Sequence, residues 1–148
     1  MLPNDSNNQP KVGVGLMIIR DGQLLLGKRK KGYGASTYGW IGGHLEFGET
    51  LEECARREAL EEAGLSDFSL RLISVSDIIA LNHHYADIEF LTLDIKSEPK
   101  VLEPDNVESW DWYDMSNLPS PLFEPVKKAI QSYQSGVIYN SRLDTNND

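Results

Sequence analysis

The stretch GGHLEFGETLEECARREALEEAGL, residues Gly42–Leu65, decides how this sequence is interpreted. Thr50 is followed three residues later by Glu53, a capping box that predicts the start of a helix. The run Leu51–Ala63 is rich in Ala, Leu, Glu and Arg, and Gly64 stands where a left-handed C-terminal cap is expected. We therefore expect a glycine-containing loop that leads into a helix over residues 51–63.

Three carboxylates of this predicted helix fall on one side of it. At about 100° per residue, Glu58 and Glu62 lie roughly 40° apart, and Glu61 lies roughly 60° to the other side of Glu58. Like charges at these spacings destabilise an isolated helix, so the arrangement needs compensation. A divalent cation such as Mg²⁺ would supply it, since carboxylate oxygens are its usual protein ligands. The alternative is a solvated charged face on which Arg56 and Arg57 pair with nearby acids.

The loop before the helix favours the metal-binding interpretation. Gly42, Gly43 and Gly48 allow close approach of the backbone and unusual torsion angles. Glu49 ends the loop immediately before the helix cap. A glycine loop that runs into a carboxylate-rich helix is suited to holding a metal ion and a diphosphate group together.

The segment resembles the signature of the Nudix hydrolase family. That signature reads Gly, five residues, Glu, seven residues, Arg-Glu, an aliphatic residue, any residue, Glu-Glu, any residue, Gly and an aliphatic residue. The sequence matches it over 23 positions through Gly43, Glu49, Arg57, Glu58, Ala59, Glu61, Glu62, Gly64 and Leu65. Ala59 is the one soft departure, because a bulkier aliphatic residue is usual at that position.

The resemblance implies a loop–helix–loop that binds Mg²⁺ or Mn²⁺. Glu58, Glu61 and Glu62 would be the metal ligands, often joined by the carbonyl of Gly42. Glu58 and Glu62 are the strongest candidates, since side chains four residues apart on a helix can reach one ion. Glu61 is either a further ligand or the group that accepts a proton from the attacking water.

The resemblance also implies roles for Arg57 and Glu49. Arg57 would orient a carboxylate through its planar guanidinium rather than contact the substrate, and Glu49 is either its partner or a group that supports the metal ligands from behind. The implied reaction is attack of a metal-activated water on a phosphorus of a diphosphate, in which the metal neutralises the phosphate oxygens. The expected catalytic residues are therefore Glu49, Arg57, Glu58 and Glu61.

Substrate contacts are expected just before the helix. The segment Gly27-Lys28-Arg29-Lys30 follows a predicted strand, and Arg29 is either a phosphate clamp or part of a solvated edge. Gly42 and Gly43 would approach the substrate through their backbone. The run GGHLEFGE resembles the triphosphate-cleaving branch of the family, so His44 either lines the site or is a structural loop residue. Ile41 departs from the pattern, because many relatives have proline there.

The remaining sequence predicts one α+β domain with a mixed sheet, and the resemblance implies that this domain is an α/β/α sandwich of the Nudix type. Alternating hydrophobic runs predict strands, and an amphipathic run near the C-terminus predicts a second helix that ends near Gly136. The expected flexible lead-in covers residues 1–10, the Nudix domain residues 11–136, and a polar tail residues 137–148. The expected strands cover residues 12–20, 23–28, 70–79, 84–95 and 107–113, with a short extended stretch over 38–41, and the second helix covers 122–133.

Composition excludes several classes of protein. The 148 residues contain 40% hydrophobic and 25% charged residues, as globular domains do, and no apolar run is long enough for a transmembrane helix. A net charge of −9 argues against binding of duplex nucleic acid. Cys54 is the single cysteine, so it forms no internal disulfide, and we expect a reducing, cytoplasmic setting. It is expected to be a core residue.

Other candidate side chains are less specific. His83 and His84 have no companion ligands for a zinc site. Trp110 and Trp112 share one strand face, where core packing is the default and base stacking the alternative. Five aromatic residues could stack on a base but are expected mainly to pack, namely Tyr33, Tyr38, Phe47, Tyr85 and Phe123.

The resemblance leaves three functions open. The leading one is hydrolysis of a nucleoside or deoxynucleoside triphosphate to the monophosphate and pyrophosphate, as in MutT-like enzymes that sanitise the nucleotide pool. The second is hydrolysis of a nucleotide sugar, ADP-ribose or another diphosphate-linked nucleotide. The third is a non-catalytic ligand sensor, which usually lacks one of the signature carboxylates. The expected partner is a small nucleotide, and homodimers are common in the family.

Overall fold

The chain is described by a computed structural model that covers residues 8–80 and 82–142. Its strands and helices follow the chain in the order β1 (Lys11–Arg20), β2 (Gln23–Lys28), β3 (Tyr38–Gly39), β4 (Ile41–His44), α1 (Leu51–Ala63), β5 (Arg71–Ala80), β6 (His83–Thr92), β7 (Asp111–Asp114), α2 (Glu124–Ser135) and β8 (Tyr139–Asn140). No helix in these two ranges has the length and apolar character needed to cross a membrane.

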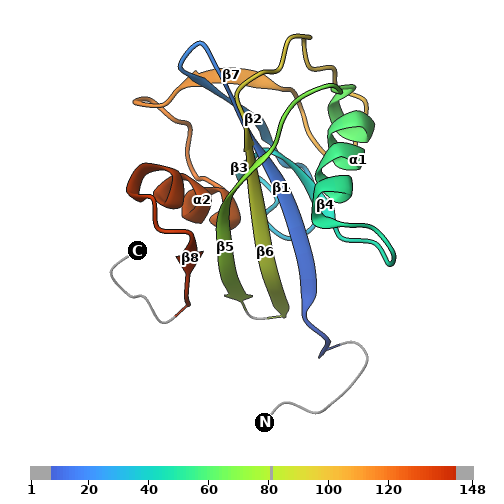
Figure 1. Cartoon of the computed structure of the whole chain (residues 1–148), viewed down its shortest axis with the longest axis vertical. Helices are drawn as coiled ribbons and strands as arrows, with labels where there is room; N and C mark the ends of the chain where they lie inside the picture. The colour runs from blue at the N-terminus through green and yellow to red at the C-terminus, as the bar shows by residue number, and fades with distance from the viewer. Residues whose placement is uncertain (1–7, 81, 143–148) are drawn as a thin grey trace.

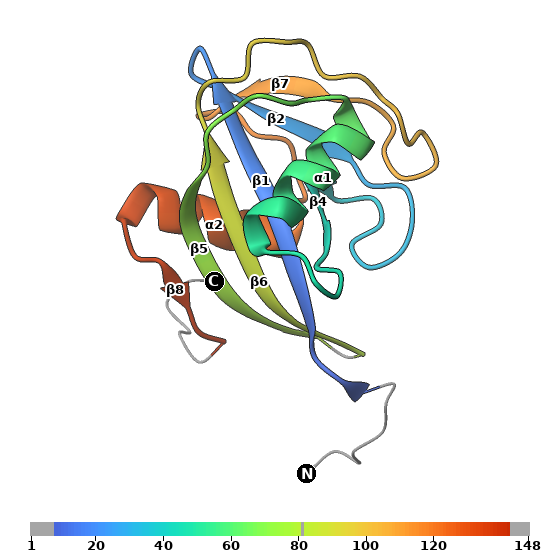
Figure 2. The same cartoon turned by 45° about the vertical axis from the view of Figure 1, so that its right-hand side comes forward.

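Strand β1 organises the sheet because it pairs with three other strands. It runs parallel to β6, while Gly13–Leu16 pairs antiparallel with β4 and its last two residues pair with β2. The main path of the sheet is β3-β2-β1-β6-β5-β8, with β7 attached to β2. Helices α1 and α2 lie on opposite sides of this mixed sheet (Figures 1 and 2). The predicted α+β sandwich is confirmed.

Each helix packs on its own hydrophobic core. The core under α1 includes Cys54, Ala55, Ala59 and Ala63, all 0–1% exposed. Their small side chains let the helix axis lie close to the sheet, which accounts for an alanine at position 59. The core under α2 contains Val126, Ala129 and Ile130 together with Met17, Leu24, Leu26, Trp40, Ile73 and Leu91.

The predicted ends of α1 are confirmed. The Thr50 hydroxyl oxygen accepts a hydrogen bond of 3.1 Å from the Glu53 N–H, so one free helix donor is satisfied. Gly64 adopts φ 68° and ends the helix in the left-handed conformation, where a side chain would be strained. These caps fix where the acidic helix begins and where the chain leaves it.

Two predicted elements are displaced. The strand expected over residues 107–113 is shorter, because only Asp111–Asp114 pairs with β2, while Val107 forms a single bridge with Arg29. The helix expected over 122–133 covers Glu124–Ser135 instead. Its first expected residues are held elsewhere, since Leu122 bridges Tyr38 and the Phe123 N–H donates to the Tyr38 carbonyl. Tertiary pairing therefore overrides the local helical pattern.

The predicted polar tail over 137–148 is wrong for its first part. Tyr139–Asn140 forms β8, parallel to β5, and Asn140 is only 4% exposed. The Asn140 amide donates to hydroxyls of Ser76 and Ser132 at 3.2 and 2.7 Å, so this polar side chain is buried with its partners satisfied. Most of the expected lead-in, residues 1–7, and the end of the tail, residues 143–148, lie outside the described residues.

Candidate active site

A cavity of about 380 Å³ opens between the sheet and the loops beside α1. The predicted substrate residues Arg29, Gly42, Gly43 and His44 all line it, as does Glu62 of α1. Residues far apart in the sequence therefore meet at one site, which is formed by the end of β2, by β4 and by α1. Its size falls within the range of roughly 300 to 1,000 Å³ that small-molecule sites occupy.

Gly43 leaves room for the Glu58 carboxylate against β4. A Cβ atom at this position would be 2.2 Å from the Glu58 carboxylate oxygen Oε1, a distance that no real contact permits. The glycine therefore lets the Glu58 side chain lie directly over the β4 backbone. Burial raises the pKa of Glu58 above its usual value, although the neighbouring Arg57 opposes the shift.

Glu62 faces the same strand one helical turn later. Its Oε2 accepts a hydrogen bond of 3.0 Å from the Gly42 N–H. Burial, and then repulsion from Glu58, raise the pKa of Glu62 to about 8. Two carboxylates four residues apart are therefore held against the glycines of β4.

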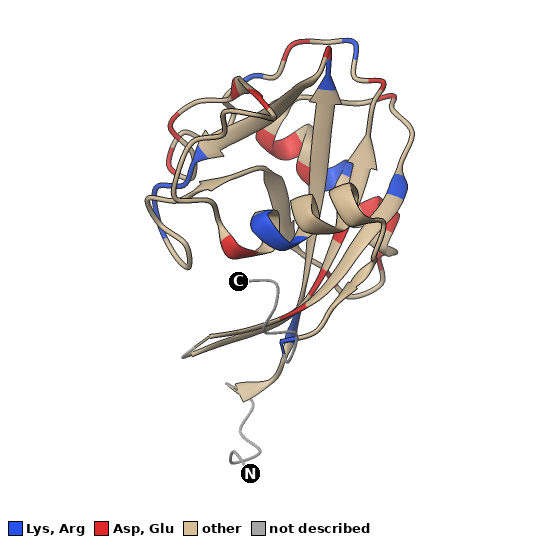
Figure 3. Cartoon of the chain, turned by 90° about the vertical axis from the view of Figure 1, so that its left-hand side faces the viewer, with Lys and Arg blue, Asp and Glu red and all other residues tan. Residues whose placement is uncertain are grey.

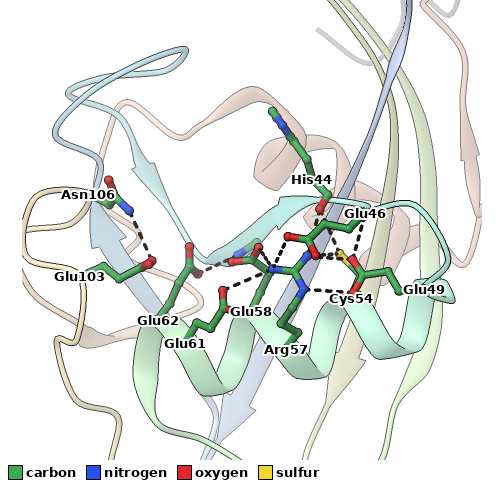
Figure 4. Close-up of polar contacts among 11 residues, drawn as sticks. His44, Glu46, Glu49, Cys54, Arg57, Glu58, Glu61, Glu62, Glu103 and Asn106 are labelled. Carbon is green, nitrogen blue, oxygen red and sulfur yellow. Dashed lines mark hydrogen bonds and ion pairs between the residues drawn. The ribbon is translucent and has the colours of Figure 1, made fainter.

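Arg57 is the centre of a charged network between α1 and the loop that precedes it (Figure 4). Its Nε and Nη2 atoms donate to the two oxygens of Glu49 at 3.0 and 2.8 Å, and Nη1 donates to Glu58 at 2.8 Å. Nη2 also donates to the His44 carbonyl at 3.1 Å. The hydrogen bonds from Arg57 hold the pKa of Glu49 down at about 2. The expected contact between Arg57 and Glu49 is present.

Glu61 is the most exposed of the three α1 carboxylates in the signature. Its side chain is 51% exposed and contacts Arg57 at 3.3 Å. The offset of roughly 60° from Glu58 leaves it at the outer edge of the helix, whereas Glu58 and Glu62 turn toward β4. The three carboxylates therefore lie on one side of α1 as the helical spacing predicts (Figure 4), and Glu61 differs from Glu58 and Glu62 in its exposure.

The carboxylates fit a divalent cation. In residues 8–80 and 82–142, no three His, Cys, Asp or Glu side chains form a ready-made ligand cluster. Glu58 and Glu62 are nevertheless partly buried and repel each other, and Glu62 lines the cavity, so a cation between them would offset both burial and repulsion. The ligand roles of Glu58, Glu61, Glu62 and the Gly42 carbonyl stay predictions.

A fourth acidic residue, Glu103, faces the α1 carboxylates across the cavity (Figure 4). It accepts a hydrogen bond of 3.3 Å from Asn106, and its charge contributes to the raised pKa values of Glu58 and Glu62. Its position could not be predicted from the sequence, because Glu103 lies 41 residues beyond Glu62 and only the fold brings the two together. In the whole chain, 23 acidic residues outnumber 14 basic ones, and α1 carries several of the acidic positions coloured red in Figure 3.

Arg29 points into the cavity rather than along a solvated edge. Its guanidinium lies 4.0 Å above the centre of the Phe123 ring and donates to the Tyr33 carbonyl at 2.9 Å. Burial lowers the pKa of Arg29, and the negative charge of Glu62 opposes this shift. The other two side chains of the basic cluster lie outside the cavity lining, and Lys30 bonds the Pro104 carbonyl.

Aromatic side chains form one wall of the cavity. Tyr33 stacks on His83 at 4.6 Å and meets the edge of Phe123 at 5.4 Å. Tyr85 lies 6.1 Å from Tyr33 and its hydroxyl is 3.2 Å from His44 Nε2. These rings are therefore available to stack on a flat ligand.

The remaining aromatic candidates lie elsewhere or pack partly. Tyr38 packs on Tyr113, and Phe47 is fully exposed, so the expectation that Phe47 packs is wrong. Trp110 and Trp112 both pack on the core under α1, and Trp110 also lines the cavity.

Two further acids in the cavity wall were also missed. Asp87 and Glu89 on β6 are 5% and 2% exposed, and both line the cavity. They lie opposite Gly13 and Gly15 of β1 in the parallel register. The sequence contains one signal for this arrangement. Glycines alternate at positions 13 and 15, and acids alternate with the same spacing at positions 87 and 89. Only the register of β1 and β6 shows that the two patterns face each other.

Comparison with known proteins assigns the family. Residues 9–133 match the model of the NUDIX domain. The chain belongs to the Nudix family of hydrolases. The segment around the acidic helix is thus a Nudix box, and hydrolases of this family generally use divalent metal ions.

Several relatives are similar over most of this Nudix chain. It is 31% identical over 105 residues to an oxidized purine nucleoside triphosphate hydrolase of Danio rerio, covering 70% of this chain and 66% of that protein. It is 33% identical over 126 residues to an ADP-ribose pyrophosphatase of Methanocaldococcus jannaschii, covering 84% and 73%. A solved MutT NUDIX hydrolase from Burkholderia pseudomallei superimposes with a TM-score of 0.81 at 36% identity, covering 84% of this chain and 98% of that one.

Proposed function

We propose that this Nudix protein hydrolyses a nucleoside or deoxynucleoside triphosphate to the monophosphate and pyrophosphate with Mg²⁺ or Mn²⁺. The observation that supports this most directly is the position of the Glu58 and Glu62 carboxylates beside a cavity that also contains Arg29 and aromatic walls. A nucleotide needs those features together, since its phosphates bind cations and its base stacks on flat surfaces.

The side chains at the site would have separate roles in binding the cation and the phosphates. Glu58 and Glu62 would hold the cation, and the contact between Arg57 and Glu49 would hold the glycine loop against the helix. Arg29 would bind a phosphate oxygen from the opposite wall. The bound cation would lower the pKa of the attacking water and neutralise the phosphate charge. Glu61 is exposed beside the site and could accept the proton from that water.

A second candidate is hydrolysis of ADP-ribose. It is favoured by the 33% identity to the archaeal ADP-ribose pyrophosphatase, which extends over more of this chain than the match to the zebrafish triphosphate hydrolase. The two candidates share the metal and phosphate machinery. They differ in what occupies the cavity beyond the first two phosphates.

A substrate panel distinguishes these functions. The protein would be assayed with the common nucleoside and deoxynucleoside triphosphates, ADP-ribose and a nucleotide sugar, each with Mg²⁺ or Mn²⁺. Release of pyrophosphate supports the proposal, release of a sugar phosphate supports the second candidate, and ligand binding without turnover indicates a sensor.

A matched pair of variants tests the Nudix box. Replacing Glu62 by Gln should lower turnover by more than about 100-fold, since even the neighbours of metal ligands contribute 10- to 100-fold. Glu52→Gln, at an exposed position in the first turn of the same helix, should leave turnover unchanged. Equal rates for both variants would contradict the assignment of the box as the catalytic site.

A further inference from the structure

The paired acids Asp87 and Glu89 belong to β6 rather than to the Nudix box. Residues two apart on a strand point to the same side, and both side chains line the cavity while almost completely buried. A buried acid normally needs a partner, because removing a charge from water is costly. Two of them in one cavity wall therefore call for an explanation.

The opposite strand is built to make room for them. A Cβ atom at Gly15 would lie 2.1 Å from Glu89 Oε2, and one at Gly13 would lie 3.3 Å from Asp87 Oδ1. The two glycines are the register partners of the two acids. The carboxyl groups therefore lie over the β1 backbone, and a side chain at position 15 would displace one of them.

Hydrogen bonds hold Glu89 but leave Asp87 incompletely satisfied. The Trp40 indole N–H donates to Glu89 Oε2 at 2.8 Å. The carboxyl groups of Glu89 and Asp87 also share a hydrogen bond. Burial, together with this contact, raises the pKa of Glu89 well above its usual value, so Glu89 holds the proton of the pair. Asp87 Oδ2 is a buried atom without a hydrogen-bond partner among the described residues.

We propose that Asp87 binds the base of the substrate and selects guanine-type purines, with Glu89 and Trp40 holding it in position. This inference rests on the proposed function for the identity of the substrate as a nucleotide. The Watson–Crick edge of guanine presents two adjacent donors, the N1 imino and N2 amino groups, which suit a carboxylate acceptor. Adenine and cytosine present an amino group beside a ring nitrogen acceptor, whose lone pair would face the Asp87 carboxylate unfavourably.

The surroundings match this role. Tyr33, Tyr85 and Phe123 line the same cavity and offer ring faces for stacking. Glu62 lines it too, so a base at Asp87 and phosphates near the Nudix box would belong to one ligand. Loss of a recognised base contact costs roughly 10- to 100-fold in discrimination, which sets the size of the expected effect.

The test compares monophosphate binding with triphosphate turnover. Binding of dGMP, dIMP, dAMP and dCMP would be measured by calorimetry, and kcat/KM would be measured for the matching triphosphates. The wild-type protein should prefer guanine, with hypoxanthine intermediate because it lacks the amino group. Asp87→Asn should lower the preference for guanine over adenine by roughly 10- to 100-fold, because it replaces one acceptor oxygen by an amide donor.

Two further variants make the result interpretable. Asp94→Asn is the same substitution at a carboxylate bound to Ser69 and Thr92 outside the cavity lining, and it should leave base preference unchanged. Asp87→Ala should weaken guanine binding without improving adenine binding. Melting curves confirm that each variant is folded.

The outcomes separate the inference from the proposed function. Triphosphate turnover with no guanine preference, or with a preference that Asp87→Asn leaves intact, overturns the role of Asp87 while the proposed function stands. Guanine-selective binding of monophosphates without any turnover supports Asp87 and contradicts the proposed function.

Discussion

Arg57 binds Glu49 through two parallel hydrogen bonds, from Nε at 3.0 Å and from Nη2 at 2.8 Å. Glu49 is the last residue of the loop before the helix cap, and Arg57 lies in the middle of α1. The pair therefore ties the glycine loop to the helix that bears Glu58 and Glu62. A planar guanidinium suits this bidentate contact, whereas an ammonium group cannot reproduce it.

Replacing Arg57 by Lys should therefore lower turnover even though the charge is kept. We expect a loss of roughly 10- to 100-fold together with a higher concentration of Mg²⁺ for half-maximal activity, as for other residues that orient metal ligands. A metal titration of initial rates measures both. Arg56→Lys is the matched control, because Arg56 binds the Phe68 carbonyl away from Glu49 and Glu58. Equal metal dependence in the two variants would contradict the orienting role of Arg57.

The glycines of β1 should differ sharply in their tolerance of a methyl group. Gly15→Ala places Cβ 2.1 Å from a buried Glu89 oxygen, whereas Gly13→Ala places it 3.3 Å from Asp87. We expect Gly15→Ala to lower the free energy of unfolding by about 1 to 3 kcal/mol through overpacking, and Gly13→Ala to have a smaller effect. Urea unfolding of both variants provides the comparison. A larger loss for Gly13→Ala would show that the carboxyl groups do not lie over β1 as described.

The Cys54 thiol should be unreactive in the folded protein. It is buried under α1, and burial followed by the neighbouring Glu49 raises the pKa of the thiol to about 12. The thiolate is the reactive form, so very little is present at pH 8. A thiol reagent such as dithionitrobenzoate should react slowly with the native protein and rapidly in guanidinium chloride. Fast, stoichiometric reaction of the native protein would mean that this helix opens readily.

The loop and acidic helix could be predicted because their signals are local. Thr50 and Gly64 fix the two ends of α1 through contacts within a few residues, and both are found as predicted. The exposure of Glu61 was harder to predict. Helical periodicity gives the direction of a side chain but not how far the neighbouring strand covers it. The Nudix signature thus located the site, while tertiary packing determines that Glu58 and Glu62 are partly buried and Glu61 is exposed.

Non-local pairing explains what the sequence did not reveal. Asp87 and Glu89 gain their significance only when β6 lies parallel to β1 with Gly13 and Gly15 in register. Nothing in a local pattern links residues 13 and 87. Asn140 was missed for the same reason, because a polar residue near the chain end is predicted to be exposed unless its serine partners on β5 and α2 are known.

The Asp87–Glu89 pair should make the stability of the fold depend on pH. Burial raises the pKa of Asp87 from 3.8 in the unfolded chain to about 6, and that of Glu89 well above 4.5. The folded state therefore binds more protons than the unfolded state above pH 4, so this contribution to stability is complete below about pH 4 and is lost as the pH rises through 6. Asp87 alone accounts for about 2 to 3 kcal/mol over this window, and Glu89 adds to it with the same sign.

The double variant Asp87→Asn, Glu89→Gln removes both titrating groups without changing their size much. Its free energy of unfolding relative to the wild-type protein should increase between pH 4.5 and pH 7.5, measured by urea unfolding at the two values. Other carboxylates, such as Glu49 with its pKa near 2, titrate equally in both proteins and cancel in the difference. A difference that stays constant with pH would mean that neither acid is perturbed by burial. The wild-type protein would then bury two charged carboxylates at neutral pH, at a cost that the hydrogen bond from Trp40 to Glu89 would not offset.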